Sequence, residues 1–232
     1  MLDGYGPMLF KGLTATLGVA VGAYCIALVL GVLGATAKLE GGRVTKGVAE
    51  AYTFVIRGVP ELILLLLVFF AIPTLIQSIV RSSSPEFVNF RLELEPFTSA
   101  VVALGFIYGA SATEVFRGAI QAIPLGQLEA ARAYGMYGRV LVVQVALPQL
   151  LRFALSGLSN LWLIVLKATA LASVIQVVEL MRVANLAAGA TNKPFTFFFA
   201  AACIYLAISA VSLVCIKFIE VYSFRGTEQG AK

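Results

Sequence analysis

Five long runs of apolar residues alternate with shorter polar segments along this chain. They cover residues 13–37, 58–80, 97–122, 148–175 and 195–222. Each run exceeds the roughly 20 residues that an α-helix needs to cross a hydrocarbon core about 30 Å thick. The pattern therefore predicts an all-α integral membrane protein, with five transmembrane helices in one domain over residues 1–232.

The segment between the third and fourth runs, residues 123–147, is too polar to cross a bilayer. Pro124 can begin a helix because the first turn needs no donor from its nitrogen. Gly135 can end that helix because glycine tolerates a positive φ. The sequence therefore predicts a pair of short helices that protrudes between two spans.

The first of these short helices is shaped to be held by another protein. Glu129 supplies a negative charge, while Ala130 and Ala131 leave a shallow surface that a groove on a partner can accept. Gly135 sets the bend that follows. The alternative is an ordinary amphipathic helix lying on the membrane surface.

Basic residues are distributed unequally over the two sides of the membrane that this topology creates. The inner side is assigned Lys38, Arg43, Lys46, Arg117, Arg132, Arg139, Arg152, Lys217, Arg225 and Lys232, and the outer side Lys11, Arg81, Arg91, Arg182 and Lys193. Cytoplasmic segments are enriched in Lys and Arg. We therefore expect the N-terminus outside, the C-terminus in the cytoplasm and the helix pair in the cytoplasm.

The polar segments take their expected places from the same topology. Residues 38–46 form a cytoplasmic loop, and residues 47–57 lie along the inner interface before the second span begins. Residues 81–96 and 176–194 return the chain to the outer side. The loop 81–96 has the composition of a solvated connector, and an extracytoplasmic binding protein is a further candidate to dock there.

Glu61, near the start of the second span, is a candidate residue of a solute pathway. A carboxylate inside a span costs roughly 2.5 to 3.5 kcal/mol on insertion scales, so it normally faces a polar cavity or a partner. Arg57 lies four residues earlier and can pair with Glu61 on one helix face. Both roles stay open from the sequence.

Two further polar residues inside the spans are candidates for the same pathway. Glu114 in the third span is followed three residues later by Arg117, so the two can neutralise each other within the helix. Asn160 in the fourth span shares a face with Ser156, and such polar residues either hold helices together or line a cavity.

Two motifs in this chain resemble those of a known family. The spacing Glu129-Ala130-Ala131, Gly135, Val145, Leu147-Pro148 resembles the "EAA" signature of permease subunits of ATP-binding-cassette (ABC) importers, with Val145 where Ile is usual. The run Arg57–Glu61 resembles the Arg-Gly-Thr-Pro element of polar amino acid permeases. In its Val-Pro-acid form it is most similar to the Q subunit of the histidine and lysine-arginine-ornithine permease and to opine-transport relatives.

This resemblance implies a type I ABC importer permease of the MetI-like fold in a bacterial inner membrane. It implies that Glu129, Ala130, Ala131 and Gly135 belong to a cytoplasmic coupling helix that docks on a separate ATPase. The implied partners are an ABC ATPase dimer, a second permease subunit and an extracytoplasmic solute-binding protein. The implied solutes are histidine and basic amino acids, with opines or other polar amino acids as the alternative.

Composition agrees with a membrane protein and argues against an enzyme. The chain has 60% hydrophobic and 12% charged residues, with a mean hydropathy of +0.94. It has no histidine, and its three cysteines, Cys25, Cys203 and Cys215, lie far apart in apolar runs, so no zinc site or histidine-based triad is expected. The net charge of +5 reflects basic residues that flank the apolar runs, which fits control of topology better than nucleic-acid binding.

The sequence also contains no Gly-x-x-x-x-Gly-Lys-Ser/Thr loop for nucleotide phosphates. We therefore expect no cofactor in this chain, with ATP and Mg bound by the partner ATPase. A secondary carrier or channel subunit would explain the spans without the inner helix pair, and a membrane scaffold would explain the helix pair without a pathway. ATP dependence of uptake distinguishes an importer permease from a carrier or channel subunit, and solute binding distinguishes it from a scaffold.

Overall fold

The computed structural model of the chain describes residues 4–83 and 94–223, and these residues form helices and short turns without a strand. In chain order the elements are α1 (Gly6–Glu40), α2 (Arg43–Gly58), α3 (Glu61–Leu66), η1 (Leu67–Ala71), α4 (Ile72–Ser83), α5 (Pro96–Gln121), α6 (Leu125–Ala133), α7 (Gly138–Leu141), η3 (Val142–Ala146), α8 (Leu147–Ala168), η4 (Thr169–Ile175), α9 (Leu180–Thr191) and α10 (Pro194–Ser223). The elements η1 and η3 are π-helical, and η4 is a 3₁₀-helix.

Five of the described segments are long and apolar enough to cross a membrane, which agrees with the five predicted spans. They are Gly6–Glu40, Glu61–Ser82, Pro96–Gln121, Gly138–Ile175 and Pro194–Val221. The fourth begins before the predicted residue 148, because the second arm of the predicted helix pair continues into α8 through η3.

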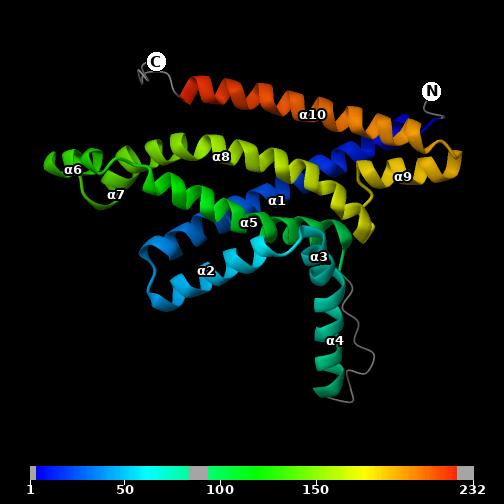
Figure 1. Cartoon of the computed structure of the whole chain (residues 1–232), viewed down its shortest axis with the longest axis horizontal. Coiled ribbons are helices and arrows are strands. Elements are labelled where there is room, and N and C mark those ends of the chain that lie inside the picture. Colours follow the sequence, from blue (N-terminus) through cyan, green and yellow to red (C-terminus); the bar gives the residue numbers. More distant parts are fainter. Residues whose placement is uncertain (1–3, 84–93, 224–232) are drawn as a thin grey trace.

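Helices α1 and α5 form the centre of the bundle and lie along its long axis with α8 (Figure 1). Small residues on one face of α1, among them Ala23, Ala27, Gly31 and Ala35, are buried. Because small side chains let two helices approach closely, this face brings α1 against α5. Helix α10 lies on the outside of the bundle and contacts α8 and α9.

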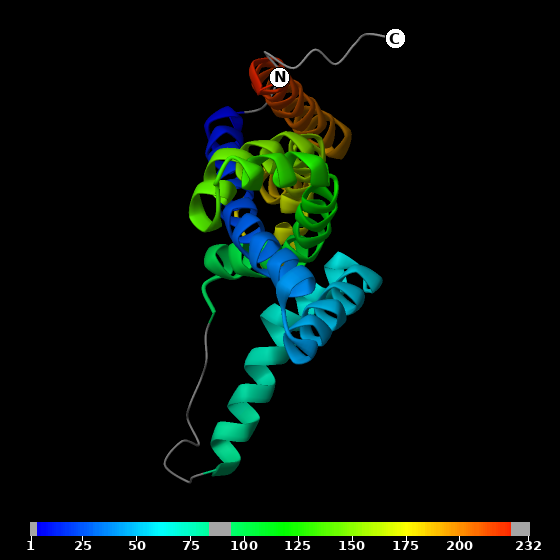
Figure 2. The same ribbon diagram turned by 90° about the vertical axis from the view of Figure 1, so that its left-hand side faces the viewer.

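The predicted cytoplasmic loop over residues 38–46 is wrong. Helix α1 continues to Glu40 and α2 begins at Arg43, so only Gly41 and Gly42 form the turn. A Cβ atom at Gly41 would collide with the carbonyl oxygen of Ala37, so the tight turn requires glycine there. Residues 47–57, expected along the inner interface, belong to α2, which packs beside α1 and α5 (Figures 1 and 2).

Helices α3 and α4 leave the bundle at a steep angle (Figure 2). The π-helical turn η1 precedes Pro73, and η3 precedes Pro148 in the same way. A proline ring clashes with the carbonyl group four residues earlier and removes one backbone hydrogen bond. Those carbonyl groups belong to Phe69 and Gln144, inside the two π-helical turns, so each turn absorbs the irregularity that its proline creates.

Some expectations fall on residues that the structure does not describe. Most of the predicted outer loop 81–96, including Arg91, lies in 84–93, and the predicted inner tail residues Arg225 and Lys232 lie beyond 223.

Candidate functional site

A break between α2 and α3 creates a cavity with polar lining residues. Helix α2 ends at Gly58, and Val59 and Pro60 take extended conformations before α3 starts at Glu61. A cavity of about 500 Å³ lies at this break and is also lined by Tyr108 and Ser111 of α5. Glu61 lines this cavity together with these two residues. The break thus places a carboxylate opposite two hydroxyl groups.

The same break separates Glu61 from Arg57, so the i,i+4 pair considered from the sequence does not form. The two residues stand on different helices, and no ion pair joins them in the described part of the chain. Both line the 500 Å³ cavity. Of the two roles left open for Glu61, the geometry therefore favours the one that faces a polar cavity.

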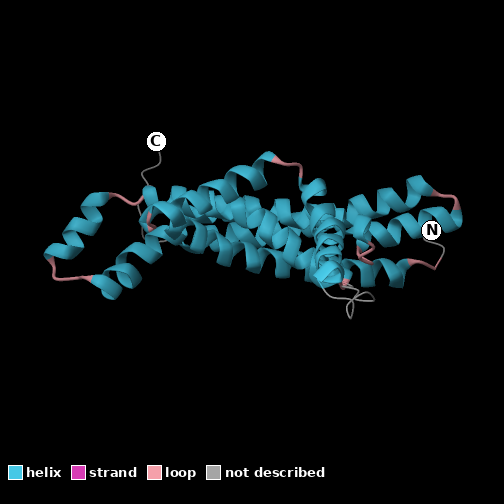
Figure 3. Cartoon of the chain, turned by 90° about the horizontal axis from the view of Figure 1, so that it is seen from below, coloured by secondary structure: helices cyan, strands magenta, loops and turns pink. Residues whose placement is uncertain are grey.

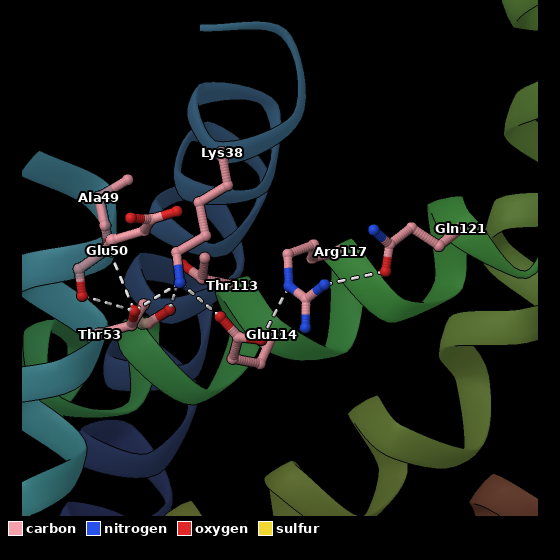
Figure 4. Close-up of polar contacts among 9 residues, drawn as sticks. Lys38, Ala49, Glu50, Thr53, Thr113, Glu114, Arg117 and Gln121 are labelled. Carbon is pink, nitrogen blue, oxygen red and sulfur yellow. Dashed lines mark hydrogen bonds and ion pairs between the residues drawn. The ribbon is translucent and has the colours of Figure 1, made fainter. Parts of the chain in front are cut away.

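Glu114 is the centre of an ion cluster that joins three helices (Figure 4). Its Oε2 atom lies 2.7 Å from Nη2 of Arg117, which confirms the intrahelical pair expected from the spacing. Its Oε1 atom lies 2.6 Å from Nζ of Lys38 on α1. Lys38 also donates to Oγ1 of Thr53 on α2 at 2.6 Å. The sequence offers no local signal for this contact, because Lys38 and Glu114 are 76 residues apart.

Two more cavities extend from the Glu61 cavity towards this cluster. One of about 600 Å³ shares Arg57 and Gly58 with the first cavity and also contains Glu114. Another of about 340 Å³ shares Lys38, Glu50 and Glu114 with the second. Each cavity in this series therefore shares wall residues with the next one, and we call the three cavities together the α2–α5 groove.

Asn160 does not join this groove. It lies exposed on α8 and lines none of the three cavities, and Ser156, one turn earlier, is exposed as well. Of the three residues that the sequence suggested for a pathway, the structure brings Glu61 and Glu114 into one groove and leaves Asn160 outside it.

Helix α6 lies at the end of the bundle, connected through α7 to α8 (Figures 1 and 3). Pro124 precedes its first residue and the helix ends at Ala133, where Gly135 has a φ of 81°. The amide of Gly135 donates to Arg132 O and that of Met136 to Ala131 O, which is the Schellman arrangement of a helix end. Both boundaries predicted for this helix are thereby confirmed.

The three residues of the Glu-Ala-Ala motif on α6 differ in their exposure. Glu129 and Ala130 are exposed, whereas Ala131 is only 7% exposed. Two large side chains at the ends of this element stand in the open, Leu125 at 74% and Tyr134 at 86% exposure. Exposed apolar groups that cluster beside polar ones are typical of an interaction surface. The geometry therefore supports α6 as a docking element, with Glu129 and Ala130 outward.

Sequence reasoning missed a buried carboxylate at the opposite end of the bundle. Glu179 is fully buried and caps α9, accepting hydrogen bonds from the amides of Met181 and Arg182 at 2.8 Å each. The hydroxyl groups of Tyr205, at 3.1 Å, and Thr16, at 3.4 Å, donate to it as well. Burial raises the pKa of Glu179 above its usual 4.5, although these hydrogen bonds act in the opposite direction and lower it. An acidic residue just before a helix was the only available signal.

Comparisons with known proteins agree with this architecture. Residues 27–220 match the family described as binding-protein-dependent transport system inner membrane component. The octopine transport system permease protein OccQ of Rhizobium radiobacter is 38% identical over 98% of this chain and 95% of its own length. The histidine/lysine/arginine/ornithine transport system permease protein HisQ of Escherichia coli is 34% identical, over 95% of each chain.

A solved structure is similar to the whole bundle. It belongs to an amino acid ABC transporter crystallised with histidines, and it matches with a TM-score of 0.79 at 30% identity. The match covers 94% of this chain and 95% of that one.

Proposed function

Because this chain belongs to the family of inner membrane components of binding-protein-dependent transport systems, we propose that it is the permease subunit of an ATP-driven importer of basic amino acids. The observation that carries the proposal is the exposed α6 with its Glu-Ala-Ala motif between two apolar spans. Energy comes from a separate ATPase, since the sequence has no phosphate-binding loop.

The proposed route of force runs through α6. Glu129 makes a charge-assisted hydrogen bond to a basic group on the ATPase, and Ala130 leaves room for the partner's larger side chains. Ala131 is buried within its own chain and so holds α6 against the rest of this subunit. Gly135 fixes the bend that joins this helix to α7. When the ATPase dimer closes around ATP and Mg, α6 is pulled inward and the spans rock towards the outward-open state.

The proposed assembly has a second permease subunit, an ATPase dimer and an extracytoplasmic solute-binding protein. The expected orientation, with the N-terminus outside and the C-terminus in the cytoplasm of a bacterial cell, rests on the distribution of basic residues. It puts α6 on the side where ATP is available.

The solute class rests on the relatives and on the chemistry of the Glu61 cavity. One relative is named for octopine and another for histidine, lysine, arginine and ornithine. A carboxylate beside the hydroxyl groups of Tyr108 and Ser111 suits a cationic side chain. Basic amino acids are the first candidates, and opines that carry a guanidinium group are the alternative.

Purification and reconstitution test the proposal. The chain is purified gently from its native membrane, and the polypeptides that accompany it are identified. We expect a P-loop ATPase and a second membrane subunit, and ATP-dependent uptake of labelled arginine by proteoliposomes supplied with the binding protein. Uptake of octopine but not arginine would favour the opine alternative. Uptake without ATP, or a preparation without an ATPase, would refute the proposal.

A further inference from the structure

The ammonium group of Lys38 occupies a cation position built by two other helices (Figure 4). Its acceptors are Oε1 of Glu114 and Oγ1 of Thr53, each at 2.6 Å. Thr53 shares its own hydroxyl proton between the carbonyl oxygens of Ala49 and Glu50, each at 3.1 Å. The Thr53 oxygen therefore accepts from Lys38 and does not donate to it. The Glu114 carboxylate and the Thr53 hydroxyl oxygen together can accept hydrogen bonds from any ammonium or guanidinium group.

The carboxylate of Glu114 has a second cationic partner besides Lys38. Arg117, on the same helix, donates to its other oxygen from Nε at 2.9 Å, and Nη1 of Arg117 donates to Gln121 at 2.8 Å. Only Lys38 comes from α1, on a flexible four-carbon stem. Lys38 is thus the exchangeable member of the cluster.

The position of Lys38 also lies on the α2–α5 groove. The Glu61 cavity shares Arg57 and Gly58 with the 600 Å³ cavity that Glu114 lines, so the two carboxylates line adjoining cavities. The side chain of Lys38 is only 11% exposed, and that of Glu114 is 20% exposed. The ammonium therefore fills the groove where a passing cation would meet its second carboxylate.

We propose that Glu114 is a second binding position for the cationic side chain of the solute, and that Lys38 is the internal cation that occupies it when solute is absent. The inference deepens the proposed function and rests on it. A solute cation that leaves Glu61 reaches Glu114 by displacing the Lys38 ammonium. Lys38 returns when the solute departs. Glu114 therefore always pairs with a second cation besides Arg117, which is either Lys38 or the solute, and its partly buried charge is not left undercompensated.

Electrostatic repulsion should prevent the solute cation and the Lys38 ammonium from binding to Glu114 at the same time. Glu114 already faces two cations, Lys38 and Arg117, so the three side chains carry a net charge of +1. A third cation is repelled unless Lys38 withdraws. Removing the charge of Lys38 should therefore strengthen binding of a cationic solute, whereas loss of a purely structural brace should weaken it or leave it unchanged.

Equilibrium binding to the purified, ATP-free transporter complex tests this directly. The probes are labelled arginine and labelled citrulline, its uncharged isostere. We expect Lys38→Met to bind arginine about threefold more tightly or better, on the scale of a partly exposed ion pair, with citrulline unchanged. The double variant Lys38→Met with Glu114→Gln should lose that gain. Lys217→Met, which removes an exposed lysine of α10, should match the unmodified complex.

Each outcome decides the inference. Unchanged arginine binding in Lys38→Met, or equal changes for arginine and citrulline, overturns it. Lys38→Gln, which retains a hydrogen-bond donor without the charge, replaces Lys38→Met if that complex does not assemble, with the same expectation. Failure of both complexes to assemble would make Lys38 a brace and also overturn the inference. If the unmodified complex shows no ATP-driven arginine uptake, the proposed function fails instead.

Discussion

Gly31 on α1 faces Ala112 on α5 so closely that a Cβ atom at position 31 would lie 2.6 Å from the Cβ atom of Ala112 and 3.0 Å from its carbonyl carbon. The second of these atoms is backbone and cannot rotate away. We therefore expect Gly31→Ala to lower the free energy of unfolding in detergent by about 1–3 kcal/mol, the usual cost of overpacking.

A matched substitution on the facing helix serves as the control. A Cβ atom at Gly118 of α5 meets nothing within 4 Å, so Gly118→Ala should be neutral or stabilising by about 0.4–1 kcal/mol. Thermal melting of both variants in the same detergent compares them. Equal melting temperatures for Gly31→Ala and the unmodified chain would show that α1 and α5 are not packed as described.

Glu61 should matter more for cationic solutes than for neutral ones. A hydrogen bond to a charged group contributes about 1.5–3 kcal/mol, and about 1.4 kcal/mol corresponds to a factor of ten. We expect Glu61→Gln to reduce arginine uptake about tenfold or more, with a much smaller change for citrulline. Glu40→Gln, at the exposed end of α1, is the control and should leave both rates unaltered. Equal losses for the two solutes would remove Glu61 from the binding position.

The size of the residue at position 130 should decide coupling. Ala130 is exposed on α6, so a large charged side chain there meets the partner without disturbing the chain's own packing. We expect Ala130→Arg to abolish most ATP-driven uptake while the membrane subunit still folds, whereas Ala130→Ser retains transport. Uptake and ATP hydrolysis are measured together in proteoliposomes. Normal uptake by Ala130→Arg would count against α6 as the coupling helix.

The buried Glu179 should make stability depend on pH. Burial raises the pKa of its carboxyl group above 4.5, so the folded state holds the proton more tightly than the unfolded state. The resulting stabilisation is complete below the unfolded pKa and is lost as the pH rises through the folded one. Glu179→Gln resembles the protonated acid and lacks this dependence.

The melting temperature of the unmodified chain, relative to that of Glu179→Gln, should therefore fall as the pH rises from below 4.5. Melting curves of the two proteins across this range provide the comparison. A difference that stays constant, or that grows in favour of the unmodified chain at higher pH, would contradict the direction of the shift.

The sequence predicts those elements of the fold that short-range chemistry determines. The five spans follow from apolar length, and the limits of α6 follow from Pro124 and Gly135, whose backbone preferences are local. The intrahelical pair of Glu114 and Arg117 follows from spacing within one helix.

Contacts between distant segments and a break inside an apparent helix were not predictable in this way. Arg57 and Glu61 have the spacing of a helical pair, yet Val59 and Pro60 are extended, because the residue before a proline is driven out of the helical conformation. Lys38 reaches Glu114 only because small residues let α1 pack closely on α5. The sequence places Glu114 in the third span but predicts Lys38 in a loop, and it gives no signal that the two lie beside each other.

The side of the membrane on which α6 lies is the most direct test of the account. In a variant whose native residues Cys25, Cys203 and Cys215 are replaced by alanine, Glu129→Cys introduces one thiol on the exposed face of α6. A membrane-impermeant maleimide should leave it unlabelled in intact cells and label it in inside-out vesicles. Labelling from the outside of intact cells would put α6 out of reach of any ATPase and would contradict the proposed coupling.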